Sequence, residues 1–442
     1  MKILNKLLTK KIKEDEYNNI NNSIKKFYNL IDNNNISFFN PYMKLFNDYC
    51  NKYSILNNEF ILHKLIKKNN RISSIGFNFK AIIKNNNNKF FYTNIFIKEI
   101  PLLSPNLLEI YNHKNLHSIN FNSYKIYNNL YNLNSSHNIE IFISYLVSKL
   151  NELNYSPNFC KMYGYYNVIL DKFTYDVSDD DEIIDYYKNS NYNYKLFNKN
   201  GETFLECRKV PTYLLLNEKA NWDISFLNKL KIVDYNLILS IIFQLFSAIV
   251  IMQNIFGIKH NDLHFGNVML KNTNITHYYF KYEKNFFKIP TYGFCIKIID
   301  WGRATYNCNN YCGRNSVFNV ESEAFGQYMF PKFNKLGKKS IDIIDFKWTD
   351  LVMISHSLLI EYNDFIKGDL KKLLMKNITD VNKNVLELKE YDWDLYLNIT
   401  KRKFKINPNQ LFKNKIFKHL RVDEKQCINK NIYNIYSSYS SS

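Results

Sequence analysis

Glycine, proline and arginine are scarce in this chain of 442 residues, which contains only 11 glycines and 8 prolines. Arginine occurs six times, so almost all of the 59 basic residues are lysines. Proteins that read nucleic-acid bases favour the planar arginine fork, which makes paired hydrogen bonds that lysine cannot make. The net charge of +19 therefore does not by itself predict direct nucleic-acid binding. An excess of Lys, Asn, Ile, Tyr and Phe is what an AT-rich genome produces for any function.

Disulfide-bonded and zinc-bound frameworks are not expected either. The seven cysteines are odd in number and widely spread, a pattern typical of a reducing compartment. Cys308 and Cys312 are four residues apart, but no second Cys/His pair lies near them, and a structural zinc needs four ligands. The N-terminal stretch MKILNKLLTKKIKEDEY becomes charged too early for a signal peptide. We therefore expect a cytoplasmic protein.

One hydrophobic run, residues 237–258, carries no charge and is long enough to cross a bilayer. Gln244, Gln253 and Asn254 interrupt it, and Gly257 breaks it near its end. A helix that is apolar on all sides can equally be the central helix of a large domain. The polar interruptions favour such a buried helix, and we expect no membrane span.

The pattern along the chain predicts an α+β protein with two lobes. Hydrophobic residues make up 46% of the sequence, enough for two or three packed units. Residues 1–65 have the pattern of a basic helical extension. Two apolar runs around the polar KNNNNK predict a β-hairpin over 75–103, and apolar spacing predicts a helix over 135–153. The expected lobes are 66–218, with an acidic insertion near 171–205, and 219–422, followed by a disordered tail over 423–442.

The stretch KHNDLHFGNVML, residues 259–270, is the first with a specific chemical pattern. Its two histidines, His260 and His264, are spaced as in a zinc-protease helix, but the residue after the first is Asn261 where such helices carry glutamate. Asp262 would lie about 200° around a helix from His260, on a different face. No third ligand follows at a useful spacing, so the pattern argues against zinc.

The same stretch fits phosphoryl transfer, which needs a carboxylate near the acceptor hydroxyl, oxygen ligands for Mg²⁺ and a lysine on the nucleotide phosphates. Asp262 and Asn267 supply a base and an uncharged oxygen ligand. A second carboxylate follows in FCIKIIDWGRA, where a β-branched strand ends at Asp300 and Gly302 allows a sharp turn.

The order of apolar helix, HNDLHFGN, strand and IIDWG resembles the catalytic loop and Asp-Phe-Gly element of the protein kinase-like family. The resemblance implies that Asp262 is the catalytic base, that Asn267 and Asp300 hold Mg²⁺, and that His260 braces the loop. It also implies a bilobal fold over about residues 70–420, with a small β-rich N-lobe and a larger helical C-lobe. Asp350 resembles the buried aspartate that ties down the catalytic loop.

The N-terminal part contains matches to the family's nucleotide site. Lys98 in IFIKEI resembles the strand lysine that holds the ATP phosphates, and Glu140 resembles its ion-pair partner. Gly76 in RISSIGFNF is the one glycine of the expected phosphate loop, where kinases usually carry two or three. This departure keeps open a catalytically weak pseudokinase that acts as a binding module.

Other departures concern the acceptor. Asn261 replaces the usual arginine, so we expect no switch by phosphorylation of the activation loop. His264 stands where many protein kinases have lysine, and DLHFGN is similar both to haspin-type kinases and to aminoglycoside and choline phosphotransferases. Together the motifs look most like the Ser/Thr kinase-like proteins of large cytoplasmic DNA viruses, mimivirus-like or poxvirus-like.

This resemblance implies ATP- and Mg²⁺-dependent phosphorylation of Ser/Thr in proteins, with acidic or nucleic-acid-associated substrates, in the host cytoplasm or the virion. A small-molecule phosphotransferase is the alternative.

Overall fold

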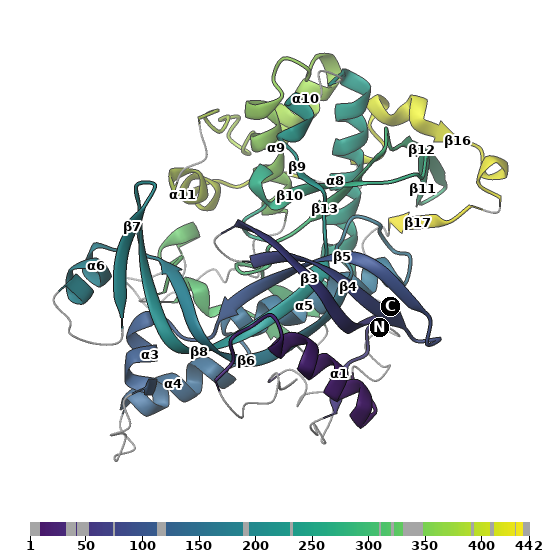
Figure 1. The fold of residues 1–442 in the computed structure, drawn as a ribbon. Coiled ribbons are helices and arrows are strands. Elements are labelled where there is room, and N and C mark those ends of the chain that lie inside the picture. Colours follow the sequence, from purple (N-terminus) through teal and green to yellow (C-terminus); the bar gives the residue numbers. More distant parts are fainter. Residues whose placement is uncertain are drawn as a thin grey trace. The chain divides into compact units, whose positions relative to one another are not determined.

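The computed structural model describes most of the chain and shows a mixed α+β fold, as predicted (Figure 1). The described residues are 9–31, 41, 53–73, 76–112, 121–188, 194–229, 233–308, 311–319, 322–329, 348–389, 393–406, 411–428 and 430–435. They form two compact units. We call Met1–Ile141 with Met162–Lys219 the N-terminal unit, and Phe142–Lys161 with Ala220–Ser442 the C-terminal unit.

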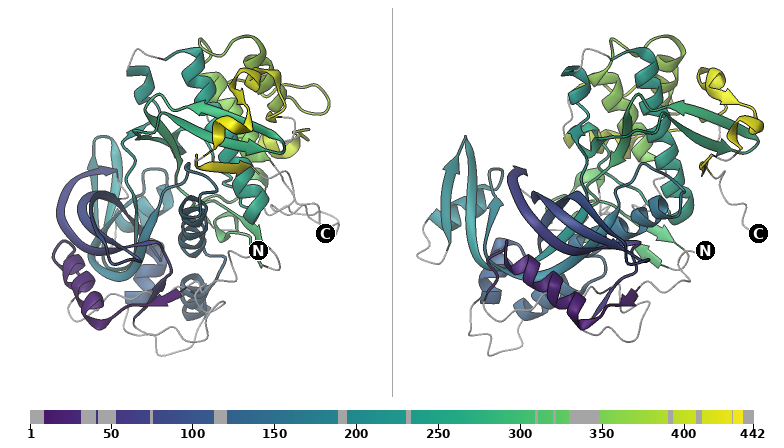
Figure 2. Two further views of the ribbon diagram at one scale, coloured as in Figure 1. Left: turned by 90° about the vertical axis from the view of Figure 1, so that its right-hand side faces the viewer. Right: turned by 45° about the vertical axis from the view of Figure 1, so that its right-hand side comes forward.

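The N-terminal unit is built on a six-stranded antiparallel sheet of order β3-β4-β5-β8-β6, with β7 pairing β8. Its strands are β3 (Phe60–Ser73), β4 (Gly76–Asn85), β5 (Phe90–Pro101), β6 (Met162–Asp176), β7 (Lys195–Lys199) and β8 (Glu202–Glu218). The hairpin predicted over 75–103 is β4–β5, with the polar KNNNNK at its turn. Register shifts between β3 and β4 are β-bulge-like irregularities, which bend strands. The curvature of these strands is visible in Figure 2.

Helices and two short strands complete this unit: β1 (Thr9–Lys11), α1 (Glu14–Lys25), β2 (Ser54–Leu56), α3 (Pro105–Asn112), α4 (Phe121–Tyr131), α5 (Ser136–Glu152) and α6 (Asp181–Lys188). The helix predicted over 135–153 is α5, whose residues beyond Ile141 belong to the C-terminal unit. Helix α1 buries Tyr17, Ile20 and Ile24, and the Ser23 hydroxyl accepts a 2.5 Å hydrogen bond from the Leu65 amide in β3.

Three predicted boundaries differ from the structure. The helical extension over 1–65 is wrong at its end, because β1–β2 and the start of β3 are strands and pairing with β4 sets the conformation from Phe60. The insertion near 171–205 is shorter, because β6 and β8 continue as a paired ribbon to Asp176 and from Glu202. The predicted disordered tail over 423–442 is wrong for Ile432–Ile435, because β17 pairs with β11 there and buries Tyr433 and Ile435; residues 429 and 436–442 lie outside the described residues.

The C-terminal unit surrounds the long helix α8 (Tyr235–Phe256), and 89% of its most apolar window is buried. This is the buried helix predicted from the hydrophobic run. The Asp234 carboxylate caps its start by accepting from the Leu237 amide at 2.8 Å, and Gly257 ends it in the left-handed conformation, φ 59°. Gln244 is satisfied inside the core, since its Oε1 accepts from Asn158 Nδ2 at 3.0 Å and from the Ile296 amide at 3.1 Å.

The remaining strands of this unit are β9 (Trp222–Asp223), β10 (Val268–Asn272), β11 (His277–Tyr282), β12 (Asn285–Pro290), β13 (Phe294–Ile298), β14 (Tyr306–Cys308), β15 (Tyr311–Gly313), β16 (Arg421–Val422) and β17 (Ile432–Ile435). Its other helices are α7 (Phe226–Lys229), α9 (Thr349–Glu361), α10 (Gly368–Asn377) and α11 (Trp393–Lys401), with 3₁₀ turns η1 (Phe265–Asn267), η2 (Ser316–Phe318), η3 (Gln327–Met329), η5 (Lys415–Leu420) and η6 (Glu424–Cys427). The hairpin β11–β12 lies in the interval between β10 and β13 and lengthens it.

Candidate functional site

The segment between α8 and β10, residues 259–267, forms a loop that we call the acid loop. It begins beside Thr305, because the backbones of Lys259 and Thr305 exchange two hydrogen bonds of 2.9 Å. The Asn261 side chain adds bonds to the Arg303 carbonyl at 3.0 Å and to Thr305 Oγ1 at 3.1 Å. The acid loop is thus fastened along the segment that follows Asp300.

Asp350, in the first turn of α9, holds the acid loop from inside the core. Its side chain is completely buried. Its Oδ2 accepts from the His260 amide at 2.9 Å and from Gln253 Nε2 at 3.2 Å, and its Oδ1 accepts from the Asn261 amide at 2.9 Å. Asn261 has a left-handed backbone, φ 61°, a conformation that needs support from its surroundings. The carboxylate of Asp350 supplies that support.

The two histidines have different roles, and neither is arranged as a metal ligand. His260 is buried, its Nε2 lies 2.8 Å from the Ile299 carbonyl, and its ring lies 4.9 Å from that of Trp301. His264 caps η1, since its Nδ1 accepts from the Gly266 amide at 3.0 Å. Burial lowers the pKa of His264, and the nearby Asp262 offsets this only in part, so the ring is neutral near pH 7.

Gly266 is required where it stands because the His264 ring folds over it. A Cβ atom at this position would lie 2.7 Å from His264 Cε1, closer than such atoms pack. The histidine that first suggested a metal site is therefore a cap of the turn that carries Asn267.

Asn267 and Asp300 are neighbours across the β10–β13 pair. Val268 pairs with Ile298, and the Ile299 amide donates to the Asn267 carbonyl at 3.1 Å. Asp300 has a left-handed backbone, φ 62°, and its Oδ1 accepts from the Gly302 amide at 3.3 Å. The strand pair therefore brings the backbones of Asn267 and Asp300 to adjacent positions at its end.

Asp262 lies in a cluster of polar side chains. Asn267 Nδ2 donates to its carbonyl at 2.8 Å, and Arg303 Nη1 lies 3.5 Å from its Oδ1. The Tyr396 hydroxyl, from α11, also donates to Oδ1. On the other side, His264 Nε2 lies 3.9 Å from Oδ2.

Arg303 and Tyr396 are functional candidates that the sequence did not reveal. Burial disfavours the charge on Arg303, but the carboxylates of Asp262 and Glu323 more than compensate and raise the pKa of its guanidinium. Its charge therefore persists at every pH at which the protein folds. Tyr396 is 134 residues from Asp262 in sequence, and no local pattern marks it.

In the N-terminal unit, Lys98 and Glu140 form an ion pair. Lys98 Nζ lies 2.6 Å from Glu140 Oε1, and the two side chains are only 14% and 6% exposed. Lys98 is held by β5, between Gly76 of β4 and Leu215 of β8, and Glu140 by α5. Gly76 is thus the backbone neighbour of Lys98.

Close packing explains the glycine at position 76. A Cβ atom there would lie 2.4 Å from the Ile97 carbonyl oxygen and 2.6 Å from the Phe96 ring. Because alternate residues of a strand share a face, Phe96 lies on the same face of β5 as Lys98. Gly76 therefore lets this aromatic ring approach β4 beside the lysine.

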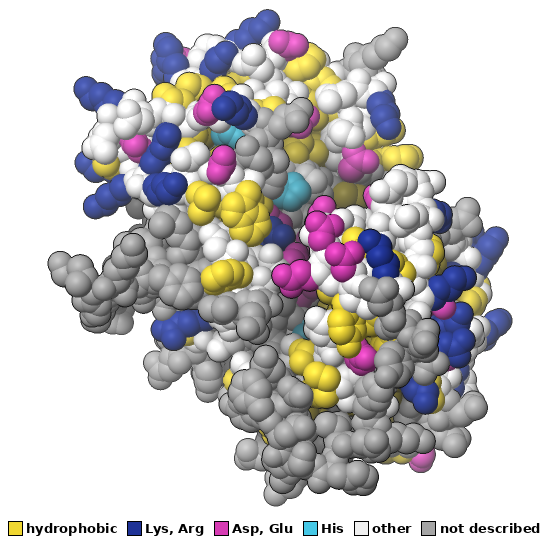
Figure 3. Space-filling view, turned by 90° about the vertical axis from the view of Figure 1, so that its left-hand side faces the viewer, with side chains coloured by type: hydrophobic (Ala, Val, Ile, Leu, Met, Phe, Trp, Pro, Cys, Tyr) yellow, Lys and Arg dark blue, Asp and Glu magenta, His cyan; other side chains and the backbone are white. Residues whose placement is uncertain are grey.

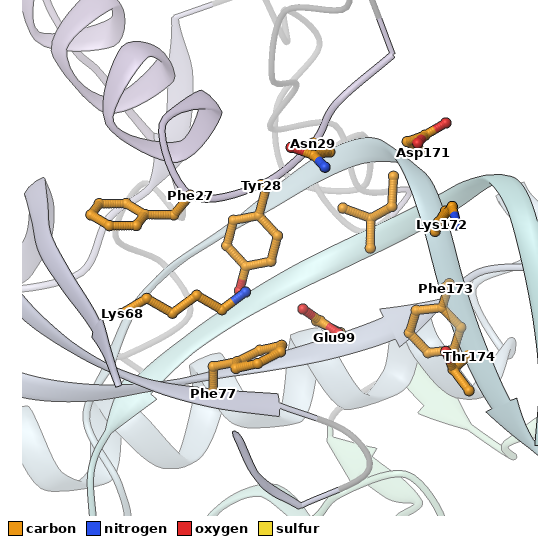
Figure 4. A pocket seen from close by; sticks show the side chains of 11 residues that line it. Phe27, Tyr28, Asn29, Lys68, Phe77, Glu99, Asp171, Lys172, Phe173 and Thr174 are labelled. Carbon is orange, nitrogen blue, oxygen red and sulfur yellow. The ribbon is translucent and has the colours of Figure 1, made fainter. Parts of the chain in front are cut away.

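A cavity of about 240 Å³ lies elsewhere in the N-terminal unit (Figure 4). Glu99 lines it and follows Lys98 in β5, so it points to the opposite face of the sheet. Lys68 reaches into this cavity, with its Nζ 3.5 Å from the Phe77 ring centre and 4.8 Å from that of Tyr28. The aromatic rings that line the cavity contact Lys68 of the protein itself. The cavity therefore lies where the segment after α1 packs against the sheet.

Comparisons with known proteins do not show which family the chain belongs to. No family model matches the chain. Over 98 residues, it is 37% identical to "Uncharacterized protein 098R" of Invertebrate iridescent virus 6. The match covers 21% of this chain and only 15% of that protein. The chain is thus similar, over about a fifth of its length, to a viral protein.

Proposed function

We propose that this protein catalyses ATP- and Mg²⁺-dependent phosphoryl transfer to Ser/Thr hydroxyls of proteins, on a bilobal kinase-like fold. The observation that carries the proposal is the arrangement around the acid loop. Asp262 and Asn267 belong to one hydrogen-bonded loop that Asp350 anchors from the core, and the backbone of Ile299, next to Asp300, hydrogen-bonds to that of Asn267. A base next to two oxygen-bearing side chains is the arrangement that phosphoryl transfer needs.

In this proposal Asp262 orients the acceptor hydroxyl. The hydroxyl oxygen attacks the γ-phosphorus of ATP, the bond to the ADP oxygen breaks, and the hydroxyl proton passes to the Asp262 carboxylate. Arg303, 3.5 Å from Asp262 Oδ1, keeps positive charge beside this carboxylate. The fixed backbone of the acid loop means that little reorganisation accompanies the step.

The oxygen atom that the Asn267 side chain offers is a suitable ligand for Mg²⁺. Asn267 Nδ2 is directed at the Asp262 carbonyl, so its Oδ1, the atom that binds hard cations, points away from that bond. Among the described residues no group of three or more His, Cys, Asp or Glu side chains could hold a metal. This agrees with Mg²⁺, which usually uses one or two carboxylates together with water and substrate phosphates. When bound, the ion would neutralise charge on those phosphates.

The Lys98–Glu140 ion pair supports nucleotide binding in the N-terminal unit. The pair is largely buried, and the carboxylate holds the ammonium group in one position. We propose that Lys98 binds the phosphates of ATP. Gly76, its strand neighbour, lets the backbone lie close to Phe96 and contributes to the shape of this region.

The surroundings of Asp262 favour a protein acceptor over a cationic small molecule. An aminoglycoside would need several carboxylates, whereas a cation, Arg303, lies 3.5 Å from the Asp262 carboxylate, and Tyr396 and His264 also lie beside it. The viral relative supports a viral setting, the host cytoplasm or the virion. On the face shown in Figure 3, lysine and arginine side chains are scattered; with a net charge of +19 they would favour acidic protein substrates.

A binding module of the same fold is the second candidate. The single glycine at position 76, with the Phe96 ring packed against it, favours weak nucleotide binding. This candidate predicts ligand binding without transfer.

One experiment separates these functions. The protein is incubated with γ-labelled ATP and Mg²⁺, and with casein, kanamycin or choline as acceptor. The proposal predicts label on Ser and Thr of casein. Label on kanamycin or choline would indicate the small-molecule activity, and ATP binding without label on any acceptor would indicate the binding module.

A further inference from the structure

Two buried tyrosines hold consecutive residues of the acid loop. The Tyr328 hydroxyl donates to the Asn261 carbonyl at 2.8 Å, and the Tyr396 hydroxyl donates to Asp262 Oδ1. Their rings meet edge to face, with centroids 5.0 Å apart and an interplanar angle of 89°. We call Tyr328 and Tyr396 the tyrosine clamp.

The clamp is buried and comes from two separate elements. Tyr328 is 2% exposed and Tyr396 3% exposed, and they lie on η3 and α11. Burial raises the pKa of Tyr328 well above its ordinary value, so its hydroxyl keeps the proton that it donates to the loop. An edge-to-face pair of buried rings adds stability and fixes geometry.

Packing alone would not require a hydroxyl on Tyr396. A phenylalanine would fill the same space, whereas the phenol places a hydrogen-bond donor on one particular oxygen of Asp262. Arg303 approaches the same oxygen at 3.5 Å. Two donors on Oδ1 make it the less basic oxygen. The reacting oxygen would then be Oδ2, on the His264 side.

Resting on the proposed function, we infer that Tyr396 is a positioning residue for phosphoryl transfer. Its hydroxyl fixes the rotation of the Asp262 carboxylate and directs the acceptor hydroxyl to Oδ2. A tyrosine so deeply buried, and packed edge to face against a second one, is a support for the base and not an exchangeable acceptor.

The test compares Tyr396→Phe with Tyr278→Phe. Tyr278 is also buried in the C-terminal unit, and its hydroxyl bonds to Thr273 and Cys295 away from the acid loop, so the control loses the same chemical group. We expect Tyr396→Phe to lower kcat for casein about tenfold, as for a misplaced reacting group. The KM for ATP and the melting temperature should match those of the control.

A second measurement does not depend on activity. Amide hydrogen exchange over residues 261–264 should be faster in Tyr396→Phe than in Tyr278→Phe, because the clamp has lost one of its two bonds to the loop. Unchanged exchange in this segment would overturn the inference whether or not the protein transfers phosphate.

Kinetic outcomes separate this inference from the proposed function. If wild type phosphorylates casein and Tyr396→Phe is equally fast, only the role of Tyr396 is wrong. A faster variant would mean that Tyr396 blocks the site, and phosphate found on Tyr396 would make it an acceptor; both results contradict a positioning role. No transfer by wild type would contradict the proposed function itself.

Discussion

The two units hold their candidate site residues in different ways. Lys98 is positioned by the backbone ladder of β5 and paired with one carboxylate. Asp262 lies on an irregular loop that depends on side chains from distant segments, chiefly Asp350 and Tyr396. The hydrogen bonds of a sheet already fix the direction of the side chains on a strand, whereas a loop needs many specific side-chain contacts to be equally rigid. The difference predicts that the loop is more sensitive to substitutions outside the site.

The largest effect on stability is expected for Asp350→Ala. The variant leaves the buried amides of His260 and Asn261 without their acceptor. We expect the free energy of unfolding to fall by about 4 kcal/mol, measured by urea denaturation. Asp364→Ala, which changes an exposed aspartate of the same unit, should change it by about 0.5 kcal/mol or less. Equal values for the two variants would show that the loop does not need its anchor.

A second stability test concerns the start of α5, in the N-terminal unit. His137 is buried in its first turn, three residues before Glu140. Burial lowers its pKa to about 4, and hydrogen bonds to the backbone at Leu130 and Asn129 offset this only in part.

Above pH about 6.5 His137 is neutral in both the folded and unfolded states. As the pH falls from there to about 4, the unfolded state takes up the proton first, so folding loses stability. Relative to His137→Phe, which cannot protonate, wild type should lose up to about 3 kcal/mol over this range. Urea denaturation at several pH values measures the difference, and parallel curves for the two proteins would rule the effect out.

Lys98→Met should separate activity from stability. Because the strand ladder and not the ion pair sets the backbone of β5, the variant should keep its fold, although the loss of the ion pair with Glu140 lowers its stability. Phosphate transfer to casein should fall about a hundredfold. The control Lys80→Met removes an exposed lysine of β4 and should leave transfer unchanged. Unfolding of Lys98→Met would break the contrast between the two units.

The smallest effect concerns His264. His264→Ala removes the acceptor for the Gly266 amide and should lower the free energy of unfolding by about 1 kcal/mol, as for a lost helix cap. His264→Asn retains a capping oxygen and should recover most of the loss. Failure of the asparagine to recover it would mean that the imidazole acts by another contact.

Much of the local structure could be predicted from the sequence. The hairpin β4–β5, helix α5 and the buried helix α8 have periodicities and turn residues that agree with their tertiary roles. The loop after α8 and the strand before Asp300 were also predicted, because apolar runs there end at polar residues and glycine.

The missed features depend on contacts between segments that are far apart in sequence. Tyr328 and Tyr396 reach the loop from 67 and 134 residues away, and nothing in their local sequence indicates a hydrogen bond to Asn261 or Asp262. Likewise, β17 is a strand because β11 offers it an edge. Its own polar neighbours suggested a disordered tail.

The proposed function requires that Lys98 and Asp262 serve one reaction. The most direct measurement is the rate of phosphate transfer from γ-labelled ATP to casein by wild type, Lys98→Met, Asp262→Asn and the double variant. We expect Asp262→Asn to be slower than wild type by about a factor of 1,000, and the double variant to be no slower, because residues that act on one step are not additive. Transfer by Asp262→Asn at the wild-type rate, or no transfer by wild type, would contradict the account.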